Sequence, residues 1–218
     1  MKNLDEIKSK INDAACFVNR DPQSIQLIAV SKKQSKTKII DLIKEGHLEF
    51  GENQLQEITG KWNDILDLRQ KIKLHFIGSI QSKKTDEILK LSDVIHSIDR
   101  EKIVQQIHKS QHKDKKAFFA QVNIGREDQK SGIDPNQIDD FLKMCKSKYN
   151  LDISGLMCIP PNNIDPEPYY LEMKKIASRN KLHNLSMGMS NDFEKAIHCG
   201  ATHIRLGTVL FGERASKQ

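Results

Sequence analysis

Short apolar runs alternate along the chain with segments whose apolar residues recur at helical spacing. The runs are rich in β-branched residues, and a strand followed by a helix recurs about every 25 residues, which is typical of successive βαβ units. Such units build a parallel sheet. The eight expected strands are 25–31, 48–50, 72–78, 93–98, 117–124, 151–157, 183–187 and 202–207.

The helical segments lie between these runs and carry signals of where helices begin and end. Asn191, with Glu194 three residues later, predicts a helix start, and Gly46 and Gly200 stand where helices should stop. An amphipathic helix is also expected before the first strand. The expected helices are 1–17, 36–46, 53–68, 84–91, 100–110, 136–148, 168–180 and 191–200.

Eight strands with helices between them predict a (β/α)8 TIM barrel, because closure of the sheet leaves no unpaired edge strand. The alternative is an open, doubly wound sheet, but no GxGxxG motif follows the first expected strand. No Gly/Ser/Pro-rich linker divides the chain, and we interpret the Pro-containing stretch 159–168 as a long loop between a strand and a helix. We therefore expect residues 1–218 to form a single α/β barrel domain with an extra N-terminal helix.

The composition is that of a soluble globular protein, with 37% hydrophobic and 29% charged residues. No apolar run approaches the roughly 18 residues that a membrane span requires. The N-terminal segment carries acidic residues and lacks the apolar region of a signal peptide. We therefore expect a cytoplasmic protein without membrane contact.

The net charge of +6 raises the question of nucleic-acid binding. Aromatic residues make up only 6% of the chain, however, and no basic run is interleaved with aromatic residues that would stack on bases. A solvated basic surface is the better interpretation, so we expect no nucleic-acid partner. The four cysteines are widely spaced without a CxxC pair, which indicates reduced thiols and supports neither a zinc site nor a redox dithiol.

The first strand ends in a lysine that alternation separates from its neighbours. Polar residues at the carboxyl ends of barrel strands are site candidates, because all the following loops meet on that face. Alternation places Lys32 on the same face as Ile28 and Val30, so Lys32 points into the mouth of the barrel if that face lines the lumen. Partial burial makes an amine nucleophilic towards carbonyls and opens Schiff-base chemistry. From this strand alone, a charged surface loop is slightly favoured over a site lysine.

Two further segments follow strands at the same face. Asn53 follows the second strand in the motif FGEN, where it is a site candidate but would equally serve as a helix cap. The polar stretch 122–133 follows the fifth strand and is longer than a minimal connection needs. Long loops on this face act as lids or binding loops, so we expect it to contribute to a site.

The last two strand–helix units predict an anion site. Ser186, Gly188 and Ser190 stand between a strand and a helix start, where hydroxyls and backbone N–H groups bind anions. Gly207 and Thr208 end the last strand. Phosphate sites in these barrels are often built after strands 7 and 8, so a phosphate site is favoured over plain turns.

An arginine lies close to this anion site in the sequence. Arg205 shares a strand face with His203 and should enter the lumen, where a buried arginine needs a partner. One ligand fits the lysine, the anion site and the arginine together. In pyridoxal 5′-phosphate (PLP), the aldehyde would meet Lys32, the phosphate would meet the anion site, and the ring nitrogen would face the arginine.

A series of motifs gives the chain a resemblance to a known family. AVSK, FGEN, HFIG with QSKK, SIDR, QVNI with KSGI, GLMCIP, LSMGMSND and IRLGTVLFGER occur in order from Ala29 to Arg214. Together they resemble the pyridoxal phosphate homeostasis proteins, single-domain relatives of the alanine racemase N-terminal barrel. The family often has SKTKP after the first strand and FIGPLQSNK after the third, and this chain differs at both places.

The resemblance implies specific roles for residues of this chain. It implies that Lys32 holds PLP as a Schiff base, that Arg205 lies by the pyridine nitrogen, and that Asn53 lies close to the cofactor. It also implies phosphate contacts. These are expected from Ser186, Ser190, Gly207 and Thr208.

The resemblance also bears on whether the protein is an enzyme. An arginine beside the pyridine nitrogen keeps that nitrogen unprotonated, which weakens the ring as an electron sink. Alanine racemases add a second domain that supplies a tyrosine base, whereas this sequence stops after the last barrel unit. Its tyrosines fall in helices or loops and offer no evident replacement; they are Tyr149, Tyr169 and Tyr170.

We therefore expect a PLP-binding protein of intracellular PLP homeostasis that holds the cofactor or passes it to PLP-dependent apo-enzymes, without catalysis of its own. A monomer or weak dimer is expected, because the racemase's second domain, with its dimer surface, is missing. The main alternative is a PLP-dependent amino-acid racemase-like enzyme. A barrel enzyme that acts on a phosphorylated substrate without PLP is another.

Overall fold

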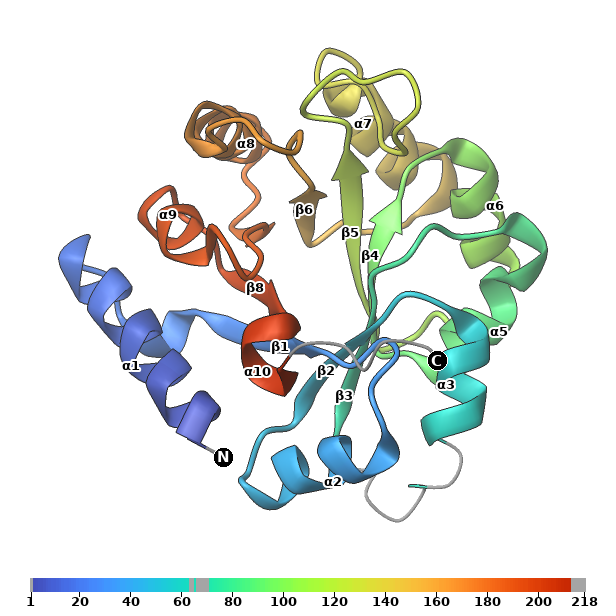
Figure 1. Cartoon of the computed structure of the whole chain (residues 1–218). Helices are drawn as coiled ribbons and strands as arrows, with labels where there is room; N and C mark the ends of the chain where they lie inside the picture. The colour runs from blue at the N-terminus through green and yellow to red at the C-terminus, as the bar shows by residue number, and fades with distance from the viewer. Residues whose placement is uncertain (1, 63–64, 66–70, 213–218) are drawn as a thin grey trace.

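The eight strands form one closed, parallel barrel in which each strand lies beside its neighbours in sequence (Figure 1). The computed structural model describes residues 2–62, 65 and 71–212. Pairing of β8 with β1, from Gln26 opposite His203 to Ala29 opposite Leu206, closes the ring. The predicted TIM barrel is confirmed, and the open sheet is wrong. The strands are β1 Gln26–Val30, β2 Glu49–Glu52, β3 Lys73–Phe76, β4 Val94–Ile98, β5 Ala117–Val122, β6 Gly155–Cys158, β7 Asn184–Ser186 and β8 His203–Leu206.

Helices surround the barrel, and the predicted extra helix at the N-terminus packs against two of the last helices, α9 and α10. Of the expected helix 53–68, residues 63–64 and 66–68 lie outside the described part of the chain. The helices are α1 Lys2–Phe17, α2 Lys36–Lys44, α3 Leu55–Trp62, α5 Thr85–Leu91, α6 Glu101–Lys109, α7 Ile138–Tyr149, α8 Glu167–Arg179, α9 Phe193–His198 and α10 Thr208–Phe211, with short 3-10 turns at η1 Pro22–Ser24 and η3 Ser82–Lys84.

Two predicted boundaries are wrong for local reasons. The sixth strand begins at Gly155 rather than near 151, because Leu151 N–H donates to Cys145 O and so completes the end of α7. Helix α9 begins at Phe193 with Asp192 in the N-cap position, so Asn191 is not its cap. The predicted helix ends at Gly46 and Gly200 are confirmed, and both glycines have positive φ angles, of 85° and 105°.

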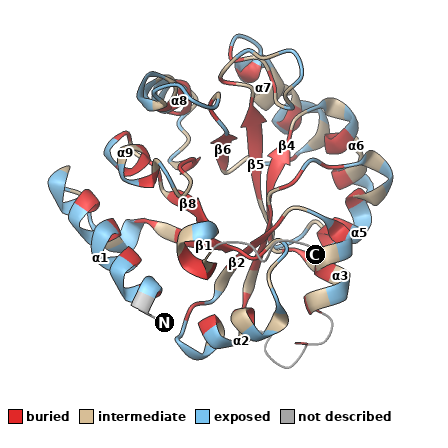
Figure 2. Ribbon diagram, viewed as in Figure 1, coloured by how far each residue is buried: buried red, intermediate tan, exposed pale blue. Residues whose placement is uncertain are grey.

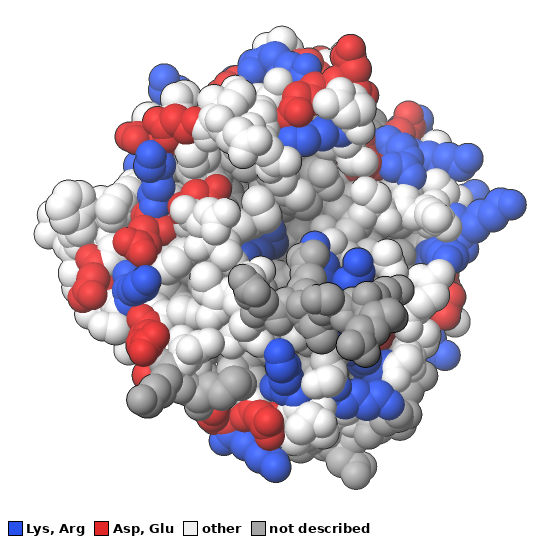
Figure 3. Space-filling model, viewed as in Figure 1, with Lys and Arg blue, Asp and Glu red and all other residues white. Residues whose placement is uncertain are grey.

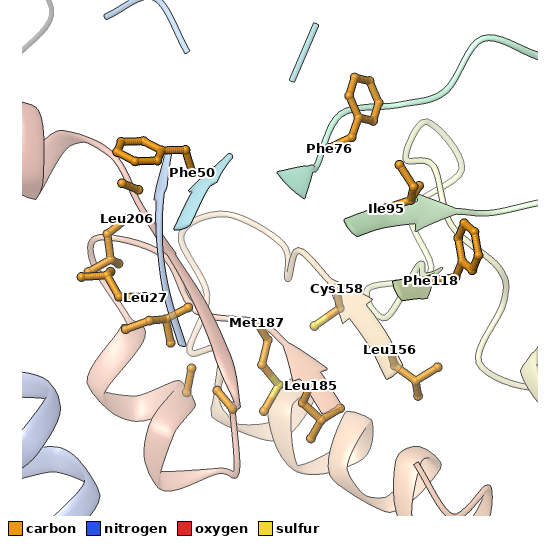
Figure 4. Close-up of a cluster of buried hydrophobic side chains, with 14 of the residues drawn as sticks. Leu27, Phe50, Phe76, Ile95, Phe118, Leu156, Cys158, Leu185, Met187 and Leu206 are labelled. Atoms are coloured by element: carbon orange, nitrogen blue, oxygen red, sulfur yellow. The ribbon is translucent and has the colours of Figure 1, made fainter. Parts of the chain in front are cut away.

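Alternation along the strands divides the interior into two cores. Outward-facing residues pack under the helices in a large apolar core, part of which is shown in Figure 4 with Leu27, Phe50 and Leu206 labelled. Figure 2 shows the result as buried strands ringed by helices whose outer faces are exposed. Inside the ring, Phe119 and Met157 belong to a small apolar cluster. The rest of the lumen contains buried polar side chains, among them His75, His96, Ser186 and Arg205.

Candidate functional site

A cavity of about 700 Å³ lies where the segments that follow the strands meet. Figure 3 shows a hollow in the middle of this face, with Lys or Arg atoms inside it. The wall comes from the segments after β1, β2, β3, β6, β7 and β8. Six of the seven residues predicted from the sequence line it: Lys32, Asn53, Ser190, Arg205, Gly207 and Thr208.

Lys32 lies at the cavity wall together with Val30, as strand alternation predicts. Ala29 faces the other way and packs in the outer core under the helices. Lys33 adopts a left-handed backbone conformation with φ of 60°, so the chain turns sharply directly after the cavity lysine. Lys38, further along the chain, lies outside the cavity wall and donates to Phe211 O.

Side chains from β2 and α3 hold the backbone on both sides of the cavity lysine. Ser31 Oγ donates to Glu52 Oε1 at 2.7 Å, and Lys61 Nζ donates to Ser31 O at 2.7 Å. On the other side, Lys33 N–H donates to Glu57 Oε2 at 2.6 Å. We name Glu52, Glu57 and Lys61 the α3 clamp. The clamp fixes the turn that carries the cavity lysine.

Glu52 is the buried centre of this clamp. Its Oε1 also accepts a hydrogen bond from Trp62 Nε1 at 3.2 Å and lies 2.7 Å from Lys61 Nζ. Burial raises the pKa of the Glu52 carboxyl, and the charge and hydrogen bond of Lys61 oppose that rise. The sequence reasoning missed this residue, although a glutamate on the outward face of a strand is an unusual signal.

Arg205 forms part of the cavity wall and is 4% exposed. Its two terminal nitrogens donate to Ser186 Oγ at 2.8 Å and to Cys158 O at 2.9 Å. Burial lowers the pKa of the guanidinium. The buried arginine therefore has the partners that burial requires: a hydroxyl oxygen and a carbonyl oxygen. No carboxylate is among its hydrogen-bond partners in the part of the chain that the structure describes.

Ser186 does not line the cavity, in contrast to the other predicted residues. It is fully buried in the lumen, where its hydroxyl contacts Arg205 and His96 Nδ1. Alternation explains this position, because Ser186 ends β7 with its side chain inside the ring, while the loop with Ser190 continues to the rim. The structure thus places Ser186 behind Arg205.

Asn53 has a buried side-chain oxygen that accepts no hydrogen bond within the described residues. A helix cap would accept one from the first turn of α3, so the cap interpretation is wrong. A buried acceptor without a partner is costly in a protein interior. At a cavity wall, such an acceptor is available to a ligand.

A buried tyrosine that was not predicted as a site residue holds the loop after β7. Tyr170 is fully buried in α8, and its hydroxyl donates to Asp192 Oδ2 at 2.9 Å. The other carboxylate oxygen of Asp192 accepts from Met189 N–H at 2.6 Å. Gly188 has a φ of 93°, and a Cβ there would approach Ala196 Cβ to 2.6 Å, so this loop requires glycine.

The stretch 122–133, expected to contribute to the site, lies outside the cavity wall. Val122 pairs with Ile133 in an isolated bridge, which closes the stretch on itself. Lys130 Nζ lies 2.6 Å from Glu127 Oε1 and donates to Pro160 O at 3.4 Å. The stretch therefore supports the loop after β6, which does line the cavity.

Over the described residues, no helix is long and apolar enough to cross a membrane. The same part of the chain contains no group of His, Cys, Asp and Glu side chains arranged to hold a metal ion. All four cysteines are unbonded thiols in the structure.

Comparison with known proteins decides the family. The family model of the alanine racemase N-terminal domain matches residues 3–215. The chain is 36% identical to the pyridoxal phosphate homeostasis protein of Pseudomonas aeruginosa, covering 98% of this chain and 95% of that protein. It is 34% identical to the protein of the same name from Vibrio alginolyticus, covering 98% and 97%. The chain belongs to the pyridoxal phosphate homeostasis protein family.

Solved structures of this family share the barrel. PipY of Synechococcus elongatus without PLP is 30% identical, with a TM-score of 0.81 over 93% of this chain and 99% of PipY. PipY with PLP bound is 29% identical, with a TM-score of 0.80 over 93% of this chain and 100% of that one. An alanine racemase of Clostridium difficile, 14% identical, shares only the fold, with a TM-score of 0.66 over 58% of its length. The structure describes the family motifs as far as Gly212. The last two residues of the final motif, Glu213 and Arg214, lie outside the described residues.

Proposed function

We propose that this protein binds pyridoxal 5′-phosphate as a Schiff base on Lys32 and serves PLP homeostasis in the cytoplasm without catalysis of its own. The family and the PLP-bound structure of its relative PipY support the proposal. The observation that carries it is the meeting of Lys32, Arg205 and the segments after β7 and β8 in one cavity. These residues come from opposite ends of the chain.

The cavity residues fit an anionic ligand with an aldehyde. Two cationic side chains, Lys32 and Arg205, line the described wall with one anionic side chain, Asp192. The carboxylate of Asp192 is already bound by Tyr170 and the Met189 amide. The buried Asn53 oxygen is available to a hydroxyl donor such as that on the PLP ring.

Each residue has a distinct part in the proposal. When bound, PLP supplies an aldehyde carbon that an amine can attack. Lys32, on the turn held by the α3 clamp, provides that amine. Ser190, Gly207 and Thr208 bind the phosphate through hydroxyl and backbone donors, and Arg205 meets the ring nitrogen. Ser186 acts through Arg205, since it lies behind it.

A role without turnover is supported by the chemistry of the cavity wall. Racemisation needs a second proton-transfer base besides the lysine, and His, Asp, Glu, Tyr or Cys can supply one. The described wall contains no His, Tyr, Cys or Glu, and its one carboxylate, Asp192, already accepts two hydrogen bonds. We propose that the cofactor is held for, or passed to, PLP-dependent apo-enzymes, and that the protein works as a monomer or weak dimer.

Absorption spectroscopy tests the binding proposal. Purified protein incubated with PLP should develop the near-visible band of a lysine adduct, and Lys32→Ala should lack it. Lys33→Asn is the matched control, because asparagine tolerates the left-handed backbone at that position. An unchanged band in Lys32→Ala, or no band in the wild type, would refute the proposal. Steady formation of D-alanine from L-alanine by the pure protein would refute the absence of catalysis.

A further inference from the structure

A line of hydrogen-bonded side chains runs through the barrel lumen from the start of β2 to the cavity. Glu49 Oε2 lies 2.5 Å from His75 Nε2, and His75 Nδ1 lies 2.8 Å from His96 Nε2. His96 Nδ1 lies 2.9 Å from Ser186 Oγ, which accepts from Arg205 at 2.8 Å. We name Glu49, His75, His96 and Ser186 the lumen chain. It connects the far end of the barrel to a residue of the cavity wall.

When both histidines are neutral, the donors and acceptors of the lumen chain fit together in a single direction. An ionised Glu49 can only accept, so His75 carries its proton on Nε2 and accepts at Nδ1. His96 must then donate from Nε2 and accept at Nδ1, which leaves the Ser186 hydroxyl to donate to it. The lone pairs of Ser186 Oγ are then directed to the N–H of Arg205.

The surroundings favour this proton arrangement. Burial is the largest influence on both histidines and lowers the pKa of His75 and, more strongly, of His96. Besides Glu49, the charged or titratable groups facing them are Lys73, Asp93, His203 and Arg205. Burial raises the pKa of Glu49, but its hydrogen bond to His75 and the nearby charges outweigh that and lower it.

Packing fixes the orientation of the central ring. The imidazole of His96 is stacked on Phe119, with ring centroids 4.5 Å apart and planes within 10°. His96 is fully buried, so its two nitrogens cannot turn to water. Its hydrogen-bond direction is therefore set by His75 on one side and Ser186 on the other.

We propose that Glu49, His75 and His96 are positioning residues for Arg205. They fix the direction of the Ser186 hydroxyl, and through it they hold the guanidinium at the cavity wall. Reversal of the chain would make His96 a second donor to Ser186 Oγ beside Arg205, so the Ser186 hydroxyl would lose His96 Nδ1 as the acceptor that fixes its direction. The effect on PLP rests on the proposed function, whereas the proton arrangement does not.

Nitrogen-15 NMR of the imidazole groups in the full-length protein without PLP tests the arrangement directly. His75 and His96, assigned by single His→Gln variants, should both be neutral at pH about 7, with the proton on Nε2. A proton on Nδ1 of either ring, or a doubly protonated ring, would overturn the proposal. This measurement is independent of cofactor binding.

PLP titration of matched variants tests the positioning role. His75→Gln keeps one donor and one acceptor and should retain the wild-type affinity within about twofold, whereas His75→Leu breaks the chain and should bind PLP about tenfold more weakly. A merely structural role would lower the thermal midpoint of both variants without this difference in affinity. Equal affinities of His75→Leu and wild type would contradict the proposal. No PLP binding by the wild type would refute the proposed function, while the NMR result would still decide the lumen chain.

Discussion

The ammonium group of Lys61 lies 2.7 Å from the carbonyl oxygen of Ser31, the residue directly before the cavity lysine. The same group lies 2.7 Å from Glu52 Oε1. A lysine on a helix outside the barrel therefore holds both a buried carboxylate and the end of β1. Site geometry and barrel stability depend on the same contact.

Lys61→Met should destabilise the fold by about 3 kcal/mol, because it leaves the buried Glu52 without its cationic partner. Methionine keeps the apolar stem of the side chain. Urea unfolding measures the loss, and the double variant Lys61→Met/Glu52→Gln should recover part of it. Lys146→Met, which removes an exposed ion pair with Asp152, should leave the unfolding midpoint nearly unchanged. Equal midpoints for Lys61→Met and Lys146→Met would show that the α3 clamp has no special role.

Two glycine substitutions should have opposite effects. A Cβ on Gly78 would lie 1.9 Å from Asn53 O, so Gly78→Ala must displace the backbone of a cavity residue. We expect it to cost about 3 kcal/mol and to weaken PLP binding. A Cβ on Gly60, inside α3, would meet no atom within 4 Å. Gly60→Ala should therefore stabilise the protein by about 1 kcal/mol. Thermal unfolding of both variants checks the pair, and a stabilised Gly78→Ala would contradict the described approach of the two segments.

Buried neutral histidines should make the fold sensitive to acid. Burial lowers the pKa of His203 from its ordinary 6.5 to about 3, and it also lowers the pKa of His75 and His96. Below pH 6.5 the unfolded chain binds protons that the folded chain does not, so stability is highest above that pH and falls with acidification. The slope is about 1.4 kcal/mol per pH unit for each such histidine.

Urea unfolding over a pH series measures this slope. His203→Asn should reduce it by the contribution of one histidine, about 1.4 kcal/mol per pH unit. Asparagine can still hydrogen-bond with the Thr202 hydroxyl, which lies 2.8 Å from His203 Nδ1 in the wild type. A wild-type free energy of unfolding that stays constant between pH about 7 and 5 would contradict the buried neutral state.

Tyr170→Phe should weaken PLP binding without disturbing the barrel. The substitution removes the hydroxyl that donates to Asp192, which costs about 1.5 kcal/mol and loosens the loop carrying Ser190. Tyr149→Phe is the matched control, because the Tyr149 hydroxyl also donates to a carboxylate, that of Glu101, but outside the cavity. The affinity for PLP should fall only in Tyr170→Phe. An equal fall in both variants would show that the hydrogen bond between Tyr170 and Asp192 has no specific role in PLP binding.

Strand alternation predicted the direction of two of the cavity side chains. It separated Lys32 from Lys33 and placed Arg205 inside the ring, because side-chain direction along a strand has a fixed period. The start of α9 was mispredicted, because the Asp192 side chain bonds to Met189 and Tyr170 rather than following local capping preference.

The contacts that complete the site could not be predicted from the sequence. Ser186 and His96 are 90 positions apart and meet only because the barrel closes. The α3 clamp likewise depends on how α3 packs over β1 and β2. Hydrophobic periodicity indicates the face of each element, but it does not specify which polar partner lies across the core.

Borohydride reduction of the PLP-loaded protein, followed by peptide mass mapping, tests the central claim most directly. The reduction makes the bond between the cofactor and its lysine permanent, so the label identifies the residue. We predict a single modified peptide that contains Lys32, and no modification of that peptide's counterpart in Lys32→Ala. A label on another lysine, or an unlabelled protein after incubation with PLP, would contradict the account.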